Sequence, residues 1–147
     1  MTPRSEGVIG TVLLVEDDDV VALTMAHELQ QLGLVVRRVV TGQDAFEAAC
    51  FGLSRPAVVV MDVLLPGLSG IEATRLVRDY ERRRGLPAVP ILGCTGLDRQ
   101  QTHEAMLRAG MDALAHKPLP VGQLALAVSR LMHRVGVSTL APALAAG

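Results

Sequence analysis

The fold is decided by the stretch from Val58 to Gly70, which reads Val-Val-Val-Met-Asp-Val-Leu-Leu-Pro-Gly-Leu-Ser-Gly. The run from Ala57 to Met61 has the length and the β-branched content of a strand buried on both faces, which is typical of a parallel sheet covered by helices. Asp62 follows where that strand ends, and Pro66 begins the turn after it. In open parallel α/β sheets the ligand site lies beyond the carboxyl ends of the strands. Asp62 is therefore the first candidate site residue.

The same pattern of an apolar strand followed by a helix recurs along the chain. It alternates five times with connections of two to six residues, which predicts a doubly wound α/β sandwich. The predicted strands cover residues 11–15, 34–40, 57–61, 89–94 and 112–116. The predicted helices run from residue 20 up to 33, from 41 to about 52, and over 71–84, 99–109 and 121–135.

Short polar signals mark helix starts and one strand at the edge of the sheet. Ser69 with Glu72 has the spacing of a capping box, and Asp98 is predicted to cap the helix over 99–109. Arg37 and Arg38 interrupt the apolar run of the second strand, which favours an edge position for it.

One domain is predicted, over residues 11–135. Residues 1–10 are predicted to be a disordered lead-in and residues 136–147 a flexible tail. We find no repeats or low-complexity segments. A chain of 147 residues is long enough to bury a substantial core in one domain.

Composition argues against nucleic-acid and membrane partners. With 14 basic and 15 acidic residues the net charge is -1, which provides no basic patch for nucleic acid or for a membrane surface. The longest purely apolar run is far shorter than the roughly 20 residues of a membrane span, and no secretory signal is visible. Cys50 and Cys94 lack metal-site or redox-motif spacing and are interpreted as reduced packing residues. We expect a cytoplasmic protein.

Polar side chains follow four of the five strands and are predicted to meet at one edge of the sheet. They are Glu16 and Asp17, Asp62, Thr95 and Lys117, whereas the second strand offers nothing comparable. Two carboxylates about 5 Å apart repel by roughly 3 kcal/mol at an effective dielectric constant near 20, so one carboxyl stays protonated or a cation binds. Mg²⁺ is the simplest such cation. With a lysine and a hydroxyl it would hold a phosphoryl group.

With these residues in this order, the sequence resembles the receiver domain of two-component response regulators. The resemblance covers about residues 11 to 135 and rests on four motifs in order: Leu-Leu-Val-Glu-Asp-Asp from Leu13, Met-Asp-Val-Leu-Leu-Pro-Gly-Leu-Ser-Gly from Met61, Cys-Thr-Gly from Cys94 and His-Lys-Pro from His116. It implies a flavodoxin-like (βα)5 fold with five parallel strands in the order 2-1-3-4-5.

The resemblance also implies a metal site and a phosphoacceptor. Asp62 would accept a phosphoryl group from a phosphohistidine on a histidine kinase or a histidine phosphotransfer protein. Mg²⁺ would be bound by Asp17, Asp62 and the backbone carbonyl of Leu64, with Glu16 acting through water.

Two further residues receive roles from the same resemblance. Thr95 and Lys117 would contact the phosphoryl oxygens, and the peptide bond between Lys117 and Pro118 would be cis. Thr95 moving towards the phosphoryl group would shift a two-state equilibrium and carry the signal.

The sequence departs from the family pattern at positions that bear on signalling. Leu114 stands where relatives usually carry a tyrosine or phenylalanine coupled to the threonine movement, which argues against an aromatic switch. Leu64 and Leu97 stand where polar side chains in relatives often help to place the hydrolytic water. We therefore expect slow self-dephosphorylation.

The resulting interpretation is a phosphoacceptor signalling domain that is not an enzyme acting on other substrates. It would be a stand-alone regulator or the receiver of a hybrid sensor kinase, with an unknown downstream target. A possible homodimer would use the helix after Asp98, the last strand and the last helix. Two alternatives stay open: an interaction scaffold that signals without phosphorylation, and a Mg²⁺-dependent hydrolase, which lacks a second carboxylate two residues after Asp62.

Overall fold

The computed structural model describes residues 10–52 and 54–134 and contains a five-stranded parallel sheet of order β2-β1-β3-β4-β5. The doubly wound α/β sandwich that the residue pattern predicted, and the flavodoxin-like strand order that the resemblance implied, are therefore confirmed. Nearly all of the predicted lead-in and the whole of the predicted tail lie outside the described residues. The strands are β1 (Thr11–Val15), β2 (Val35–Val39), β3 (Val58–Asp62), β4 (Ile91–Thr95) and β5 (Ala113–His116). The helices are α2 (Asp19–Gln30), α3 (Gly42–Phe51), α4 (Gly70–Arg84), α5 (Gln100–Ala109) and α6 (Gln123–Arg134).

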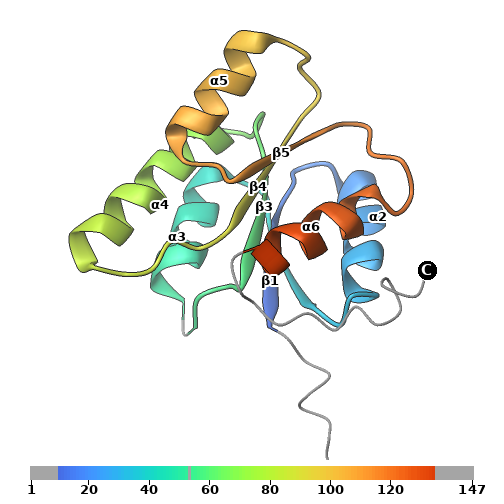
Figure 1. The fold of residues 1–147 in the computed structure, drawn as a ribbon, viewed down its shortest axis with the longest axis horizontal. Helices are drawn as coiled ribbons and strands as arrows, with labels where there is room; N and C mark the ends of the chain where they lie inside the picture. The colour runs from blue at the N-terminus through green and yellow to red at the C-terminus, as the bar shows by residue number, and fades with distance from the viewer. Residues whose placement is uncertain (1–9, 53, 135–147) are drawn as a thin grey trace, which may run out of the picture.

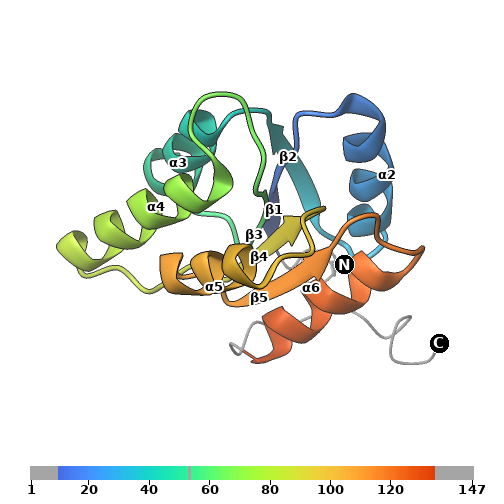
Figure 2. The ribbon, with the colours of Figure 1, turned by 90° about the horizontal axis from the view of Figure 1, so that it is seen from above.

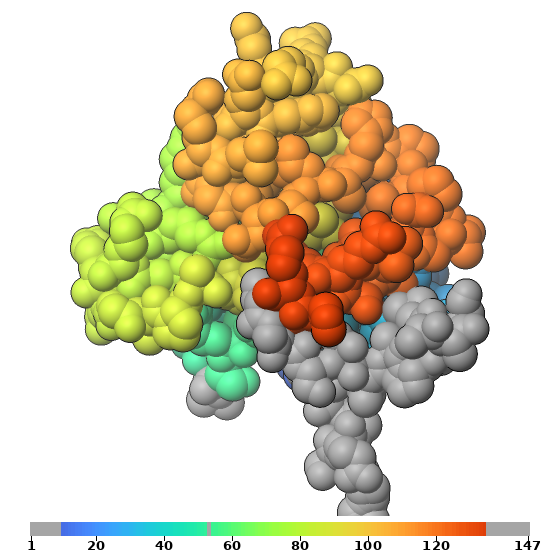
Figure 3. Space-filling view, viewed as in Figure 1, coloured from blue at the N-terminus to red at the C-terminus, as the bar shows by residue number. Residues whose placement is uncertain are grey.

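The helices cover the sheet on both sides. Figures 1 and 2 show α3, α4 and α5 on one side and α2 and α6 on the other. In the space-filling view α4 forms the left part of this face, α5 the upper part, and α6 lies near its centre (Figure 3). The molecule is a three-layer sandwich, and the residues of the central strands β1, β3 and β4 are buried except for Thr11.

Alternate residues of the central strands enter two separate cores. In β1, Val12 and Leu14 pack with α2 and α6, whereas Leu13 and Val15 pack with α3 and α4. Each of these four side chains is at most 1% exposed. A strand buried on both faces needs an unbroken apolar run, and this is the pattern seen in the sequence.

β2 lies at the edge of the sheet, as its two arginines indicated. It pairs only with β1 among the described strands, from Thr11 opposite Val35 to Val15 opposite Val39. Arg37 and Arg38 are both exposed. Charged side chains on an edge strand discourage pairing with another chain.

Of the helix caps predicted at Ser69 and Asp98, the first is confirmed and the second is wrong. Ser69 and Glu72 form the reciprocal capping box of α4, since the Glu72 carboxylate accepts a bond from the Ser69 N–H and the Ser69 hydroxyl from the Glu72 N–H. The prediction that Asp98 caps the next helix is wrong. The N-cap of α5 is Arg99, which makes no side-chain cap bond, because the helix begins one residue later than expected.

Candidate functional site

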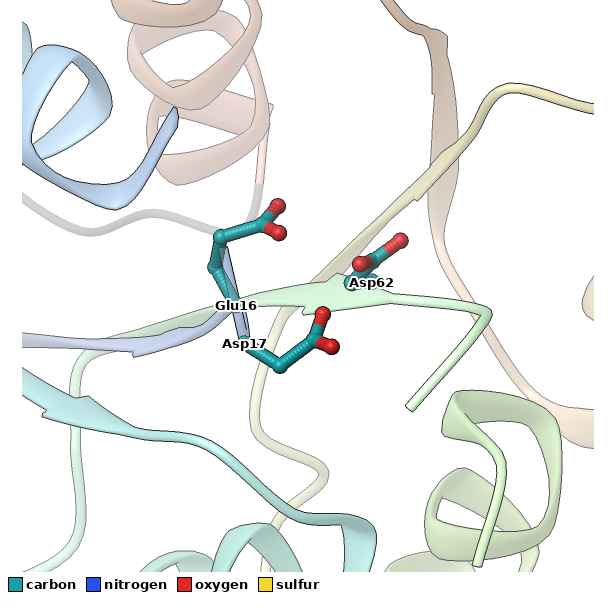
Figure 4. Close-up of side chains that lie close together, drawn as sticks. All are labelled: Glu16, Asp17 and Asp62. Carbon is teal, nitrogen blue, oxygen red and sulfur yellow. The ribbon is translucent and has the colours of Figure 1, made fainter. Parts of the chain in front are cut away.

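Three carboxylates converge at the carboxyl ends of β1 and β3. One oxygen from each of Glu16, Asp17 and Asp62 can be chosen so that all lie within 4.8 Å of one another (Figure 4). Glu16 and Asp62 are buried, at 1% and 6% exposure, whereas Asp17 is exposed. The sequence placed these residues at one sheet edge, and the structure brings them together.

Lys117 adds one positive charge to this cluster from the segment after β5. Its Nζ lies 2.8 Å from Glu16 Oε1 and 3.3 Å from Asp62 Oδ2. Burial alone would lower the pKa of Lys117, but the hydrogen bond to Glu16 and the negative charges of Asp62 and Glu16 raise it instead. Lys117 is therefore held as a cation between two buried carboxyl groups.

Asp62 is the carboxyl group most perturbed by its surroundings. Its burial raises the pKa to about 6 from an ordinary 3.8; Lys117 opposes this rise, and Glu16 and Asp17 add to it by repulsion. Without a further cation the cluster therefore disfavours the ionised form of Asp62. A divalent cation among the three carboxylates would favour ionisation.

Thr95 lies at the end of the neighbouring strand and within the same edge of the sheet. The register of β3 with β4 sets Asp62 opposite Cys94, so that Thr95 comes one residue further along. Thr95 is buried, and its Oγ1 accepts a hydrogen bond from the Leu97 N–H at 2.9 Å. The backbone N–H of Lys117 in turn donates to the Thr95 carbonyl at 2.8 Å. Thr95 and Lys117 are thus tied to each other next to the acidic cluster.

The turn after Asp62 is tight and depends on a glycine. The Gly70 N–H donates to the Val63 carbonyl at 2.9 Å, which closes the loop that contains Leu64. A Cβ at position 70 would lie 1.9 Å from the carbonyl oxygen of Asp62, a separation that no real Cβ adopts. Gly70 therefore lets α4 start directly behind the acidic cluster. The Leu64 side chain is exposed on this loop, at 61%.

The peptide bond between Lys117 and Pro118 is cis, as the resemblance implied. The two cysteines are buried and free. Burial raises the pKa of Cys50 to about 11 and, together with the charge of Asp62, that of Cys94 to about 12. Thiols with such pKa values are poor nucleophiles at neutral pH, which agrees with their interpretation as packing residues.

One residue near the site was missed by the sequence analysis, which expected nothing comparable from the second strand. Arg38 of β2 donates from Nε to the backbone carbonyl of Glu16 at 2.9 Å and from Nη1 to Asp19 Oδ1 at 2.8 Å. In the sequence, an arginine at position 38 indicated only that this strand lies at the exposed edge of the sheet. It did not indicate a contact with the loop after β1.

The fold and the site together define a class of protein. An acidic cluster with a lysine, at the carboxyl edge of a parallel sheet of order 2-1-3-4-5, describes a flavodoxin-like domain with a charged site at the edge where such sheets bind their ligands. The chain belongs to the response regulator receiver domain family, whose model matches residues 12–129. Receiver domains are the signalling domains of two-component systems.

Individual relatives agree with this assignment. The chain is 33% identical over 137 residues to a probable transcriptional regulatory protein, TcrX, of Mycobacterium tuberculosis, and the match covers 93% of this chain and 56% of TcrX. The receiver domain of sensor histidine kinase PA1611 from Pseudomonas aeruginosa, solved with a magnesium ion in its active site cleft, is 33% identical with a TM-score of 0.74, covering 84% of this chain and 98% of that one. The match to TcrX thus spans little more than half of that regulator.

A third neighbour was solved in complex with another protein. It is the receiver domain of the Saccharomyces cerevisiae response regulator Ssk1, crystallised with the histidine phosphotransfer protein Ypd1. That match has a TM-score of 0.78 and 25% identity, and it covers 85% of this chain and 90% of the other.

The residues at the site fit a hard divalent cation. The donor set is three carboxylates, two of them buried, and carboxylate oxygens are the ligands that Mg²⁺ prefers. The acidic cluster and the magnesium-containing receiver structure both fit Mg²⁺ binding. Among the residues that the structure describes, no helix has the length and apolar character needed to cross a membrane.

Proposed function

We propose that this receiver domain accepts a phosphoryl group on Asp62 in the presence of Mg²⁺. The observation that carries the proposal is the approach of Glu16, Asp17 and Asp62 within 4.8 Å, with the Lys117 ammonium between two of them. Two buried acids and one exposed acid with a single lysine are a poor arrangement for stability and a suitable one for binding a cation and a phosphoryl group.

Each residue then has a separate role. Asp17, Asp62 and the backbone carbonyl of Leu64 would hold Mg²⁺, and Glu16 would help through water and by keeping Lys117 in place. Bound Mg²⁺ supplies positive charge that offsets the charge of the phosphoryl oxygens. Lys117 and Thr95 would contact those oxygens directly, Lys117 with its ammonium and Thr95 with its hydroxyl.

The transfer step needs little beyond placement. An ionised oxygen of Asp62 forms a bond to phosphorus while the bond between phosphorus and the donor's imidazole nitrogen breaks, and that nitrogen keeps the electron pair. Because the transition state is largely dissociative, positioning and charge neutralisation supply most of the catalysis. The chain would promote only its own phosphorylation and dephosphorylation.

The proposed donor is a phosphohistidine on a histidine kinase or a histidine phosphotransfer protein in the cytoplasm. Receiver domains similar to this chain occur in a sensor histidine kinase and in a complex with a histidine phosphotransfer protein, which supports this class of partner. Movement of Thr95 towards the phosphoryl group would shift the loop that connects β4 to α5. This would change the surface that a downstream protein or a second copy of the chain contacts. Leu114, which packs against the core, stands in place of the aromatic residue of relatives, so the signal would have to pass without an aromatic switch.

The experiment that tests the proposal is the intact mass of the protein after incubation with Mg²⁺ and acetyl phosphate. One added phosphoryl group is expected with Mg²⁺, and none in EDTA or in Asp62→Asn. Because some receivers refuse small donors, a phosphorylated histidine phosphotransfer protein is used as a second donor. Failure with both donors would overturn the proposal in favour of a scaffold, and hydrolysis of the donor without added mass would favour a hydrolase.

A further inference from the structure

Arg38 spans two points of the loop that carries the metal-site carboxylates. Its Nε donates to the Glu16 carbonyl at 2.9 Å, and its Nη1 bonds Asp19 Oδ1 at 2.8 Å. The Arg38 side chain is 29% exposed, and its planar guanidinium fork fits two acceptors at once. Glu16 and Asp19 are the two ends of the segment between β1 and the first turn of α2, with Asp17 inside it.

The rest of that segment is held by bonds of its own. The Glu16 N–H donates to the Val39 carbonyl at 3.2 Å, and Asp18 accepts from the N–H groups of Val20 and Val21 as the N-cap of α2. The Asp18 N–H donates to Glu16 Oε2 at 3.2 Å. Among the described residues, Arg38 is the side chain of β2 that joins the strand to this loop.

The loop needs such support because its carboxylates repel one another. Glu16 and Asp17 are neighbours in sequence, and both place oxygens near Asp62. If the loop were free to move, the carboxylates of Glu16 and Asp17 would move away from Asp62. Two unit charges about 5 Å apart repel by roughly 3 kcal/mol at an effective dielectric constant near 20. Some residues do not bind the metal themselves but form bonds that orient the metal ligands. Mutation of such a residue typically weakens metal binding about 10- to 100-fold.

We propose that Arg38 is a positioning residue for the Mg²⁺ site, fixing the Glu16–Asp19 loop so that the carboxylates of Glu16 and Asp17 converge on Asp62. This inference rests on the proposed function, since it concerns the same cation site. It gives the edge strand β2 a part in the site although no side chain of β2 enters the cluster. Arg38 acts through the backbone of Glu16 and touches neither the cation nor the phosphoryl group.

Charge has to be separated from position in the test. Arg38 is paired with Asp19, so that removing Arg38 alone would leave an extra negative charge near the site and would favour Mg²⁺. The double variant Asp19→Asn with Arg38→Gln removes both charges and leaves the net charge unchanged. Arg37→Gln is the matched control, because Arg37 is the neighbouring residue of the strand and points to the opposite face.

The experiment is calorimetric titration of the metal-free protein with Mg²⁺ at neutral pH. The double variant is expected to bind about tenfold more weakly than wild type, and Arg37→Gln within about twofold of it. Thermal unfolding in EDTA checks that each variant is folded. Arg38→Lys, which keeps the charge but loses the fork, is expected to lie between wild type and the double variant; it replaces the double variant if that one does not fold.

The outcomes separate the two proposals. Equal Mg²⁺ affinity in wild type and in the double variant, or an Arg38→Lys affinity equal to wild type when the double variant does not fold, would overturn the role of Arg38 and leave the site intact. Absence of Mg²⁺ binding by wild type would instead overturn the cation site and, with it, the inference.

Discussion

The two edges of the sheet each hold a cluster of buried charge, and the clusters are built in opposite ways. At the carboxyl edge, three carboxylates share one ammonium group, that of Lys117. At the amino edge, the single buried carboxylate of Glu81 is bonded by the guanidinium groups of Arg55 and Arg78 and by the Val89 N–H. The first cluster has three carboxylates for one ammonium group, whereas in the second both carboxylate oxygens of Glu81 are bonded to donors.

The difference fits a separate role for each cluster. Glu81 lies near the end of α4, and its partners come from the segments before β3 and β4, so that the cluster joins three parts of the chain. Arg78 also bonds Asp112, which precedes β5 and accepts from the Ile91 N–H. A satisfied network of this kind fixes structure. The acidic cluster, in which three carboxylates face one ammonium group and Asp17 is exposed to water, is suited to bind a cation.

Loss of Glu81 is expected to have the largest effect on stability. Glu81→Gln leaves two guanidinium groups without their buried carboxylate partner, and breaking a buried ion pair in this way costs about 3–5 kcal/mol of unfolding free energy. Urea denaturation measures the loss, while phosphorylation of the fraction that stays folded is unchanged. Asp79→Asn, which removes exposed pairs with Arg82 and Arg83, is the control and is expected to cost under about 1 kcal/mol. A Glu81→Gln loss as small as that of the control would remove the distinction between the clusters.

Replacement of Asp62 is expected to stabilise the metal-free protein at neutral pH, whereas replacement of Glu81 destabilises it. Because its folded-state pKa of about 6 lies above its ordinary 3.8, protonated Asp62 favours the folded state. This stabilisation is fully present below about pH 4 and is lost as pH rises through 6, a change of about 3 kcal/mol. In EDTA, Asp62→Asn should therefore gain stability relative to wild type from acid to neutral pH, and Mg²⁺ should remove the gain. A difference that does not vary with pH would contradict this account.

Lys117 competes with a cation for the same carboxylates. Lys117→Gln removes the ammonium that lies 2.8 Å from Glu16 and 3.3 Å from Asp62. Mg²⁺ is then expected to bind about tenfold more tightly, a gain of about 1.4 kcal/mol, while phosphorylation becomes slower because the phosphoryl oxygens lose a partner. Calorimetry and intact-mass kinetics measure the two effects, with His116→Gln as a neighbouring control. Weaker Mg²⁺ binding in Lys117→Gln would show that the lysine organises the cluster more than it opposes the cation.

The smallest predicted effect concerns the lifetime of the phosphoryl group. Leu64 is exposed beside the site and offers no polar group to orient water. Wild type is expected to keep its phosphoryl group for minutes or longer, and Leu64→Asn to lose it about fivefold faster, a change of about 1 kcal/mol. The decay of intact mass after donor removal gives both rates. A wild-type lifetime of seconds would show that Leu64 does not exclude the hydrolytic water.

The sequence predicted those features that depend on local pattern and on strand order. Apolar runs identified the strands. Because the carboxyl ends of parallel strands meet at one edge of the sheet, the polar residues that follow these strands were predicted to lie together. They are Glu16, Asp17, Asp62, Thr95 and Lys117. Contacts set by tertiary structure could not be predicted. Arg38 bonds a backbone carbonyl 22 residues earlier, and Glu81 pairs with Arg55 across 26 residues. The Asp98 cap failed because the start of α5 shifted by one residue, which the capping pattern alone does not fix.

The most direct test of the central claim is to locate the phosphoryl group in the phosphorylated protein. Borohydride converts an aspartyl phosphate to homoserine, and peptide mass spectrometry then identifies the modified residue. We predict that homoserine appears at Asp62 alone and only after incubation with Mg²⁺ and donor. Modification of Asp17 or of a histidine, with Asp62 unchanged, would contradict the account.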